Sequence, residues 1–500
     1  MLSFDIKPRY TALVVWELII VLAVMLWGYR NIQQDDSYIY YTYAKNIADR
    51  QGYVFNAGER INATTSPLYT IVLAFAAWWW SLPLPSAGHL VGIGSLFGVC
   101  LLLLFACRET DLRVFPFVLP FIFLSNPLLI NAVGMETFLT MFLAVLSIYL
   151  YTRGRHNAAA LACSLAVLAR PDALLLAVIL IDYAVINSRR LPSSRSMVIF
   201  ALPLAAWGVS SWGYFGSVFP STLSAKLAQT QSGRWGTGWI FLQTLGHPAI
   251  WQGNITRNIT LGSALLGGAV LTLKARQWQL ARYPVLYLIL LWNVSYLVVY
   301  GFVLNPPGYP WYYTPLALGI SILIALLVEA LFRVVISRCA VKAEIIVLVF
   351  LLCAALAALP LPVIQSLQGA PVKYTAYRLA AEWLNEHAAG ATVGTNEIGV
   401  IGYFYDGTVI DGLGLVTPGV AEHVRERDYS WYIHAYQPTF LVFNHPPRPV
   451  LEAMVDEDWF AASYRLETVI EAPGGGVAIY QRGAASPEAR GEKIREEKGE

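Results

Sequence analysis

Two adjacent carboxylates, Asp35 and Asp36, follow the first hydrophobic run of the chain in the stretch DDSYIYYTYAK. A carboxylate held in a fixed place can act as a general base, because it can take the proton of an attacking hydroxyl group. Together with Glu136 in GMET, the pair could also offer oxygen ligands to a divalent cation. An amphipathic stretch follows the pair, so a role as a helix N-cap stays open as well.

Two basic side chains are candidates for holding an anion. Arg170 lies in LARPD, and its planar guanidinium suits a bidentate contact with phosphate. An ion pair with Asp172 is the structural alternative. Lys226 lies in FPSTLSAK and could bind phosphate or place its ammonium group at the membrane interface. Glu136 interrupts a hydrophobic stretch, where a charge is costly unless it faces water or a partner, although a helix start would also explain it.

A third group of candidates is aromatic. Tyr309, Trp311 and Tyr312 lie within GYPWYYTP, between two hydrophobic runs. Such residues form the aromatic belt of a membrane protein, and they could equally form a platform for a sugar or for the first isoprene units of a lipid. Arg60, in GERINATTS, is a further polar candidate for substrate binding. The cysteines and histidines show no zinc-like spacing.

The composition shows what must position these residues. The 500 residues are 57% hydrophobic and 13% charged, with a mean hydropathy of +0.53. Soluble domains carry about 25% charged residues, so we expect a polytopic α-helical membrane protein. The net charge of +2 argues against nucleic acid as a partner. Hydrophobic runs near membrane length lie at about 11–30, 88–107, 114–131, 135–152, 157–169, 172–187, 196–214, 258–274, 283–303, 313–333 and 342–363.

The basic connections between these runs predict a topology. They lie at 107–113, 152–156, 187–195, 273–282 and 332–342, and the positive-inside rule assigns them to the cytoplasm. All of them fall inside only if the short run at 67–82 lies along the outer interface rather than crossing the bilayer. The sequence therefore predicts about eleven spans, with the N-terminus inside, and every candidate site residue outside.

The rest of the chain predicts a soluble α/β domain. YTAYRLAAEWLNEHA has helical periodicity, whereas TVIDGL, TFLVFN and VAIYQR have the pattern of short strands. We expect a transmembrane catalytic module at 1–363, with its first external loop at 31–87, and an external α/β domain at 364–482. Residues 483–500 are charged and lack aromatic residues, which predicts disorder.

Several motifs occur in a familiar order: DDSYIYYTYAKNIADRQGYVFNAGERINATTSPLY, GMET, LARPDALLL, FPSTLSAK and GYPWYYTPL. In this order they resemble one branch of the GT-C glycosyltransferases, the arabinofuranosyltransferases that finish mycobacterial cell-wall polysaccharides. The resemblance spans about 31–313 and extends more loosely to TNEIGVIGYFYDGTVIDGLGLV at 395–416. The chain departs from the pattern at Ser221, where relatives carry Asn.

The resemblance implies a glycosyltransferase whose donor carries its sugar, best a pentofuranose such as arabinofuranose, on a polyprenyl phosphate. The acceptor would be a surface glycan, glycolipid or protein, and the reaction would take place on the outer face of the inner (plasma) membrane. The family's catalytic Asp maps onto Asp35 or Asp36, with Asp35 favoured as the base. Glu136 matches an acidic residue of the second external loop, and Arg170 and Lys226 match residues that hold the phosphate.

Two other classes of function stay open. A transporter or lipid flippase would ordinarily need ionisable residues midway through its spans and paired halves. Asp182 and Glu329 instead lie near predicted cytoplasmic ends, and no inverted repeat is evident. An assembly scaffold acting through the α/β domain would leave the polar loops without a role.

Overall fold

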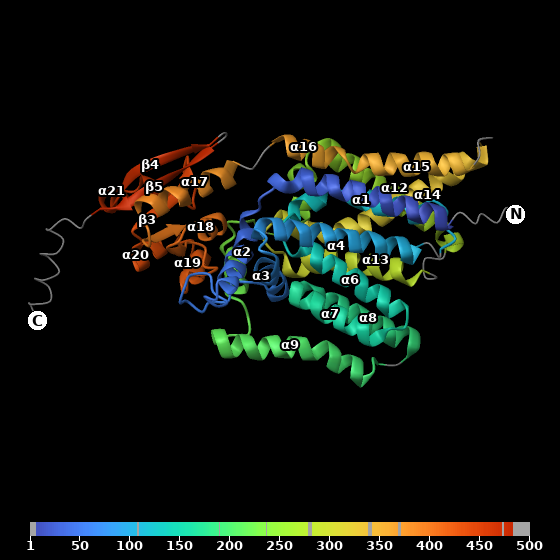
Figure 1. Ribbon diagram of the computed structural model, residues 1–500, viewed down its shortest axis with the longest axis horizontal. Coiled ribbons are helices and arrows are strands. Elements are labelled where there is room, and N and C mark those ends of the chain that lie inside the picture. Colours follow the sequence, from blue (N-terminus) through green and yellow to red (C-terminus); the bar gives the residue numbers. More distant parts are fainter. Residues whose placement is uncertain are drawn as a thin grey trace, which may run out of the picture. The chain divides into compact units, whose positions relative to one another are not determined.

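Each long hydrophobic run of the sequence forms helix in the computed structural model (Figure 1). The structure describes residues 7–107, 110–189, 191–236, 238–278, 283–338, 343–368, 372–472 and 475–483. The chain divides into two units. Unit 1 comprises Met1–Gln34, Thr64–Phe219 and Trp235–Gly369, and unit 2 comprises Asp35–Ala63, Pro220–Arg234 and Ala370–Glu500.

Unit 1 is helical throughout its described part. Five helical segments of its described part are long and apolar enough to cross a membrane, a sixth such segment begins in this unit at Ile345, and shorter apolar helices accompany them. Its helices are α1 (Lys7–Gly28), η1 (Tyr29–Asn31), α3 (Pro67–Trp80), α4 (Leu84–Cys107), α5 (Phe115–Leu124), η2 (Pro127–Ala132), α6 (Thr137–Thr152), α7 (His156–Ala169), η3 (Pro171–Ala173), α8 (Leu174–Ser188), α9 (Ser194–Phe215), α11 (Ile240–Leu245), η4 (Pro248–Trp251), α12 (Asn254–Trp278), α13 (Pro284–Val298), the π-helical η6 (Val299–Leu304), η7 (Pro310–Leu316), α14 (Ala317–Arg338), α15 (Ala343–Ala357) and α16 (Pro360–Gln368).

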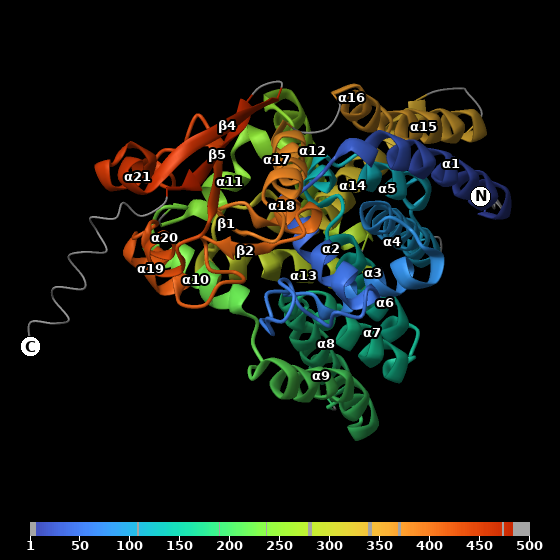
Figure 2. The ribbon, with the colours of Figure 1, turned by 60° about the vertical axis from the view of Figure 1, so that its left-hand side comes forward.

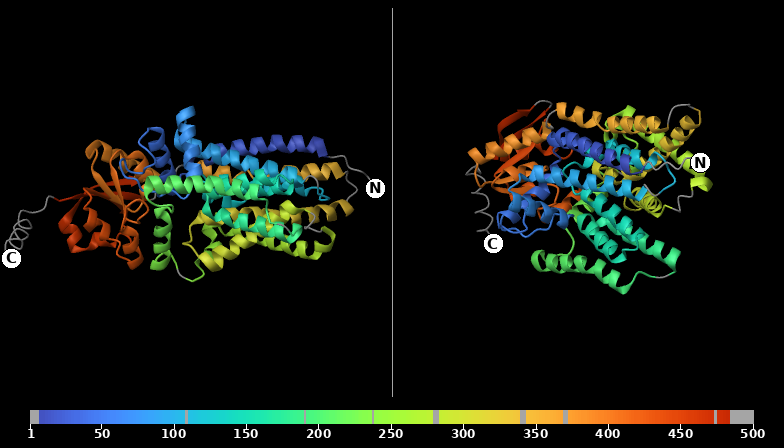
Figure 3. Two further views of the ribbon diagram at one scale, coloured as in Figure 1. Left: turned by 90° about the horizontal axis from the view of Figure 1, so that it is seen from below. Right: turned by 45° about the vertical axis from the view of Figure 1, so that its right-hand side comes forward.

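The short helix α5 lies among several of the longer helices of unit 1. Helix α5 contacts α4, α14 and α15, and α1 runs along α4 and α16 (Figures 1 and 3). Phe115 and Phe121 of α5 are fully buried in the resulting apolar core. The predicted run at 342–363 is broken in two, because Pro360 starts α16 after α15 has ended.

A buried carboxylate closes one end of this core. Glu329 of α14 is fully buried and accepts backbone N–H groups of Arg113, Val114 and Phe115 at 2.9–3.1 Å. Arg333 donates to the same carboxylate at 2.7 Å. Glu329 therefore caps the N-terminus of α5, where an anion is favourable.

Unit 2 is the expected α/β domain. Its five-stranded sheet has the order β2-β1-β3-β5-β4, in which β2, β1 and β3 are parallel and β5 is antiparallel to both of its neighbours. The strands are β1 (Thr392–Thr395), β2 (Thr408–Asp411), β3 (Phe440–His445), β4 (Tyr464–Ala472) and β5 (Gly475–Arg482). Its helices are α2 (Asp35–Ala48), α10 (Ser221–Ser232), α17 (Val372–His387), α18 (Ile398–Phe404), α19 (Val420–Glu426), α20 (Trp431–Tyr436), η8 (Ala453–Asp456) and α21 (Asp458–Ser463).

The boundaries of this domain differ from the sequence-based expectation. Residues 35–63 and 220–234 belong to it, rather than to the membrane module, and α16 belongs to unit 1. Figure 2 shows α17 on the sheet and α18 beside α2. The side chain of Asn56 explains part of this: its amide exchanges two hydrogen bonds with the backbone of Val409 in β2, at 2.9 and 3.0 Å. The tail expected to be disordered, 483–500, lies outside the described residues beyond 483.

Candidate active site

The two carboxylates of the first motif have different surroundings within unit 2. The carboxylate of Asp35 accepts the backbone N–H groups of Gly399 and Val400, each at 3.0 Å. It thus caps α18, which lies more than 360 residues further along the chain. Asp36 forms no hydrogen bond or ion pair with any described residue and is partly exposed. Of the two carboxylates, that of Asp36 is the one left available to a substrate.

Helix α2 is held firmly at this point. A Cβ atom on Gly399 would lie 1.9 Å from the carbonyl oxygen of Asp35, so only glycine permits this approach of α18 to α2. The tyrosines that follow the carboxylates supply the apolar packing. Tyr38 is fully buried, and its ring lies 5.1 Å from that of Tyr41 and 5.4 Å from that of Tyr403. These tyrosines are therefore core residues of unit 2.

The charge of Asp35 is set by its neighbours. Burial raises its pKa to about 6, and the nearby charges of Glu397 and Asp36 act in the same direction. The ammonium group of Lys373 and the N–H group of Val400 oppose this increase. Asp35 is therefore mostly ionised at neutral pH and takes up a proton in mildly acidic solution.

Lys226 faces a buried carboxylate that the sequence analysis missed. Asp411, at the end of β2, is fully buried and accepts the backbone N–H groups of Leu413 at 2.7 Å and Val416 at 3.1 Å. Burial raises the pKa of Asp411 to about 6, against these N–H groups and the charge of Lys226 on α10. The N–H groups that bind Asp411 belong to the turn after β2. The sequence analysis interpreted this segment, TVIDGL, only as a strand.

In unit 1, Arg170 is enclosed by partners. It is 5% exposed, and its guanidinium contacts Glu136 at 3.1 Å and Asp172 at 2.8 Å. Tyr300 donates a hydrogen bond to the same Asp172 oxygen at 2.7 Å, and the guanidinium lies over the ring of Tyr312 at 5.7 Å. These contacts favour the structural alternative, an ion-pair network, over a phosphate contact by Arg170.

The same network accounts for Glu136. Its carboxylate is 3% exposed, precedes α6 and faces Arg170. Although burial alone would raise the pKa of Asp172, the charge and hydrogen bonds of Arg170 hold it below its usual range. The guanidinium of Arg170 is thus already engaged by two acidic side chains.

The remaining candidates are placed less tightly. The rings of Tyr309 and Trp311 stack at 4.7 Å with an interplanar angle of 12°, and both are partly exposed. Arg60 is exposed at the end of the loop after α2. In the described part of the chain, no group of three or more His, Cys, Asp or Glu side chains lies close enough to hold a metal ion. Each oxygen of Asp35 already accepts one N–H group, which leaves Asp36 as the freer carboxylate of the pair.

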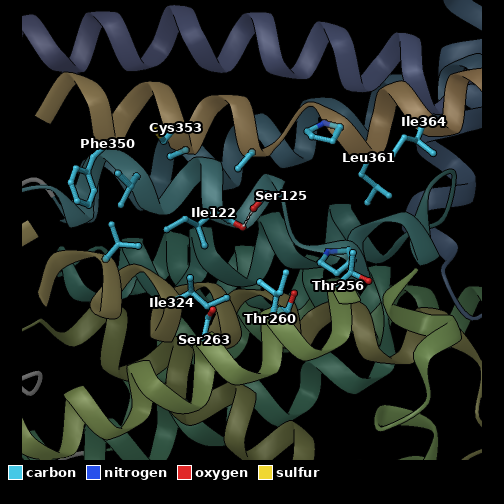
Figure 4. Close-up of a pocket in the computed structure, with 17 residues that line it drawn as sticks. Ile122, Ser125, Thr256, Thr260, Ser263, Ile324, Phe350, Cys353, Leu361 and Ile364 are labelled. Atoms are coloured by element: carbon cyan, nitrogen blue, oxygen red, sulfur yellow. Dashed lines mark hydrogen bonds between the residues drawn. The ribbon is translucent and has the colours of Figure 1, made fainter. Parts of the chain in front are cut away.

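An apolar cavity of about 540 Å³ lies in unit 1 among α5, α12, α14, α15 and α16. Figure 4 shows Ile122, Ile324 and Phe350 on its walls, with no charged side chain among those that line it. The hydroxyl groups of Ser125 and Thr256 donate to backbone carbonyls of their own segments, at 2.9 and 3.0 Å. The walls therefore suit a hydrocarbon chain.

Comparison with solved structures identifies the fold. ArnT from Cupriavidus metallidurans, bound to undecaprenyl phosphate, matches 96% of this chain and 99% of its own with a TM-score of 0.62 and 12% identity. The oligosaccharyltransferase AglB from Archaeoglobus fulgidus, in complex with an inhibitory peptide and a dolichol-phosphate, matches 88% of this chain and 70% of its own, with a TM-score of 0.55 and 12% identity. The chain therefore shares the fold of ArnT and AglB.

The fold shared with these structures, the apolar helices of membrane length and the α/β unit agree with the fold class that the sequence predicted. Residues 367–486 match a family model described as a domain of unknown function, DUF8728. No curated protein matches the chain in sequence. The narrower resemblance to arabinofuranosyltransferases stays a prediction.

Sequence reasoning missed Lys373 and Glu397, whose charges act on Asp35, and Arg448, which pairs with Glu397. Lys373 and Arg448 form ion pairs with Glu397, which directly precedes α18. The only sequence signal was the resemblance at 395–416, which includes Glu397 but neither of its partners.

Proposed function

We propose that this protein is a GT-C glycosyltransferase that moves a sugar from a polyprenyl phosphate to an acceptor hydroxyl group at the outer face of a membrane. One observation carries the proposal: Asp36 presents a carboxylate without a hydrogen-bonding partner in the described chain, next to a carboxylate that is held rigidly. A general base needs this combination of fixed position and a free oxygen. The sequence motif favoured Asp35 as the base, whereas the contacts of Asp35 favour Asp36.

The proposed reaction uses Asp36 as the base. The acceptor oxygen attacks the anomeric carbon, its proton moves to the Asp36 carboxylate, and the bond from the anomeric carbon to the phosphate oxygen breaks. The polyprenyl phosphate leaves with the bonding electron pair, and Lys226 stabilises its charge. Asp35 holds the start of α2 in place through α18.

The cavity of unit 1 supports a lipid-linked donor. Its apolar walls and volume of about 540 Å³ suit several isoprene units. Helix α16 lines one end of the cavity and also packs against η1, which ends four residues before Asp35 in the chain. ArnT and AglB were both solved with a polyprenyl phosphate.

The finer parts of the proposal rest on the motif resemblance. We infer a pentofuranose such as arabinofuranose as the donor sugar, a surface glycan, glycolipid or protein as the acceptor, and the inner (plasma) membrane as the location. Arg60 and the stacked rings of Tyr309 and Trp311 are the proposed contacts to the substrates, because they are accessible and suit hydroxyl groups and apolar sugar faces.

The transporter alternative gains little from the structure. Glu329, one of the acidic residues of the hydrophobic runs, serves as a helix cap. Glu17 of α1 also lies within a hydrophobic helix, but one such residue does not supply the paired halves that a transport pathway ordinarily has.

The test is transfer from defined donors. We expect the purified protein in lipid nanodiscs to release polyprenyl phosphate from a polyprenyl-phosphoryl pentofuranose faster than from hexose donors. Asp36→Asn keeps the shape of the side chain but removes the base, so the rate should fall by at least about 10²-fold. Release of polyprenyl phosphate and transfer of labelled sugar are the two measurements.

Asp35→Asn is the matched control. Asparagine can accept only part of the hydrogen bonding from α18, so we expect a smaller loss of rate together with a lower melting temperature. Near-normal transfer by Asp36→Asn with an inactive, folded Asp35→Asn protein would return the role of base to Asp35. No transfer by the unchanged protein from any polyprenyl-phosphate sugar would refute the proposed function.

A further inference from the structure

An ion-pair cluster in unit 2, built on the largely buried carboxylate of Glu397, lies beside the proposed catalytic pair. Glu397 has a side chain that is 13% exposed, and it pairs with Lys373 of α17 and, at 2.5 Å, with Arg448 of the loop after β3. The carboxylate of Glu397 must lose most of its water here, and two cationic partners that stay partly exposed compensate for this cost. The proposed reaction has no direct use for any of these three residues.

The cluster reaches Asp35 through α18. Glu397 immediately precedes α18, and the first N–H groups of this helix, those of Gly399 and Val400, donate to the Asp35 carboxylate. Because Gly399 leaves no space for adjustment at Asp35, a shift of the start of α18 must also shift Asp35. The ion pairs of Glu397 therefore locate the start of α2.

We propose that Lys373, Glu397 and Arg448 are positioning residues for the Asp35–Asp36 pair, which fix the start of α18 and balance the charge around Asp35. The proposal rests on the proposed function in assigning Asp36 to catalysis. Lys373 and Glu397 act on the carboxylate directly by their charges, whereas Arg448 acts through Glu397.

The charged groups near Asp35 determine whether a substitution raises or lowers its pKa. They are Asp36 on α2, Lys373 on α17 and Glu397 before α18, and the hydroxyl group of Tyr377 on α17 is a neutral titratable group near them. The positive charge of Lys373 favours ionised Asp35, and the negative charge of Glu397 opposes it. Removing one charge or the other should therefore move the titration of Asp35 in opposite directions, a result that a merely structural role does not predict.

The experiment measures transfer by the full-length protein between pH 5 and 8. Lys373→Met should raise the pKa of Asp35, so that the loss of activity from pH 8 to pH 6 becomes about 3-fold larger. Glu397→Gln should lower it, and the loss should become smaller than in the unchanged protein. Glu382→Gln, on the exposed side of α17 in a pair with Arg378, is the matched control and should leave the profile in place.

A second measurement does not depend on activity. The amides of residues 398–404 should lose protection from hydrogen exchange as Asp35 is protonated, after correction for the intrinsic pH dependence of exchange. This transition should move upward in Lys373→Met and downward in Glu397→Gln. It would still test the inference if the protein transferred no sugar, so the two proposals can fail separately.

A conservative variant distinguishes the loss of a charge from the loss of the folded structure. Lys373→Arg keeps the charge and should keep the position of both transitions, even if the rate falls. Shifts in the same direction for Lys373→Met and Glu397→Gln, or a uniform loss at every pH without any shift, would overturn the proposal and leave the cluster with a structural role only.

Discussion

Arg170 and Lys226 carry the same charge in very different surroundings. Arg170 is enclosed by Glu136, Asp172 and aromatic rings. Lys226 is partly exposed on α10, and its charge lowers the pKa of the buried carboxyl group of Asp411. Their substitutions should therefore affect different measurements.

Lys226→Ala should weaken donor binding by about 2 kcal/mol, the scale of a charge-assisted contact. Arg170→Ala should instead lower the free energy of unfolding by about 3–5 kcal/mol, because two buried carboxylates lose their counter-charge. Binding of a polyprenyl phosphate and thermal unfolding would be measured for both variants. Unchanged lipid binding in Lys226→Ala would remove this residue from the site, and a stable Arg170→Ala protein with lost binding would restore the phosphate role of Arg170.

The raised pKa of Asp35 predicts a pH dependence. The Asp35 carboxyl group is fully ionised only well above its pKa of about 6. As the pH falls through this value, a proton binds and the charge that supports both α18 and the base is lost. We expect the transfer rate at saturating donor to fall on the acid side of about pH 6, with an inflection that Asp35→Asn lacks. A rate that stayed constant down to pH 5 would contradict this prediction.

Among the elements, α15 and α16 decide the shape of the cavity. Proline at 360 separates them, and α16 then lines one end of the cavity that Phe350 and Cys353 of α15 line further along (Figure 4). Helix α15 also carries apolar residues that face away from the cavity, such as Leu352, which is 55% exposed. A substitution that fills the cavity and a control substitution outside it can therefore both be made in α15.

Filling the cavity should weaken the hold on the lipid chain. Ala357→Trp places a large side chain within the cavity lining, so we expect a higher KM for long-chain donors and little change for a donor with a single short isoprenoid. Leu352→Trp lies outside the lining and should leave both values unchanged. An equal loss for long and short donors would indicate distortion of the helix rather than displacement of the lipid chain.

At the scale of the whole molecule, the placement of α3 determines which candidate residues lie on the same side of the membrane. Either α3 crosses the bilayer or it lies along the outer interface. Helix α3 has 14 residues, and Trp78, Trp79 and Trp80 at its end are each about 60% exposed. At 1.5 Å per residue such a helix spans about 21 Å, less than the hydrocarbon core of about 30 Å. An interfacial position fits this length.

A reporter fused after Leu82 should therefore read external, on the same side as a reporter fused after 483. A reporter in the connection at 187–195 should read cytoplasmic and serves as the opposite control. A cytoplasmic result after Leu82 would reverse the predicted side of every later loop, and with it the proposed location of the reaction.

Properties of consecutive residues were readable from the sequence alone. The hydrophobic runs predicted helices at the right positions, because the length and polarity of a run depend only on neighbouring side chains. The same local logic found α17, β2, β3 and β5. It missed β1 and β4, and neither the α/β pattern nor the runs showed that residues 35–63 complete the sheet domain.

Only the tertiary structure decided how the charged residues are used. That Asp35 caps α18, that Arg170 is enclosed by Glu136 and Asp172, and that Lys226 faces Asp411 all depend on contacts between distant parts of the chain. A side chain's role as a base or as a cap is set by the donors around it and by its burial. Local periodicity carries no information about such partners, because a helix start looks the same whether its carboxylate meets substrate or another helix.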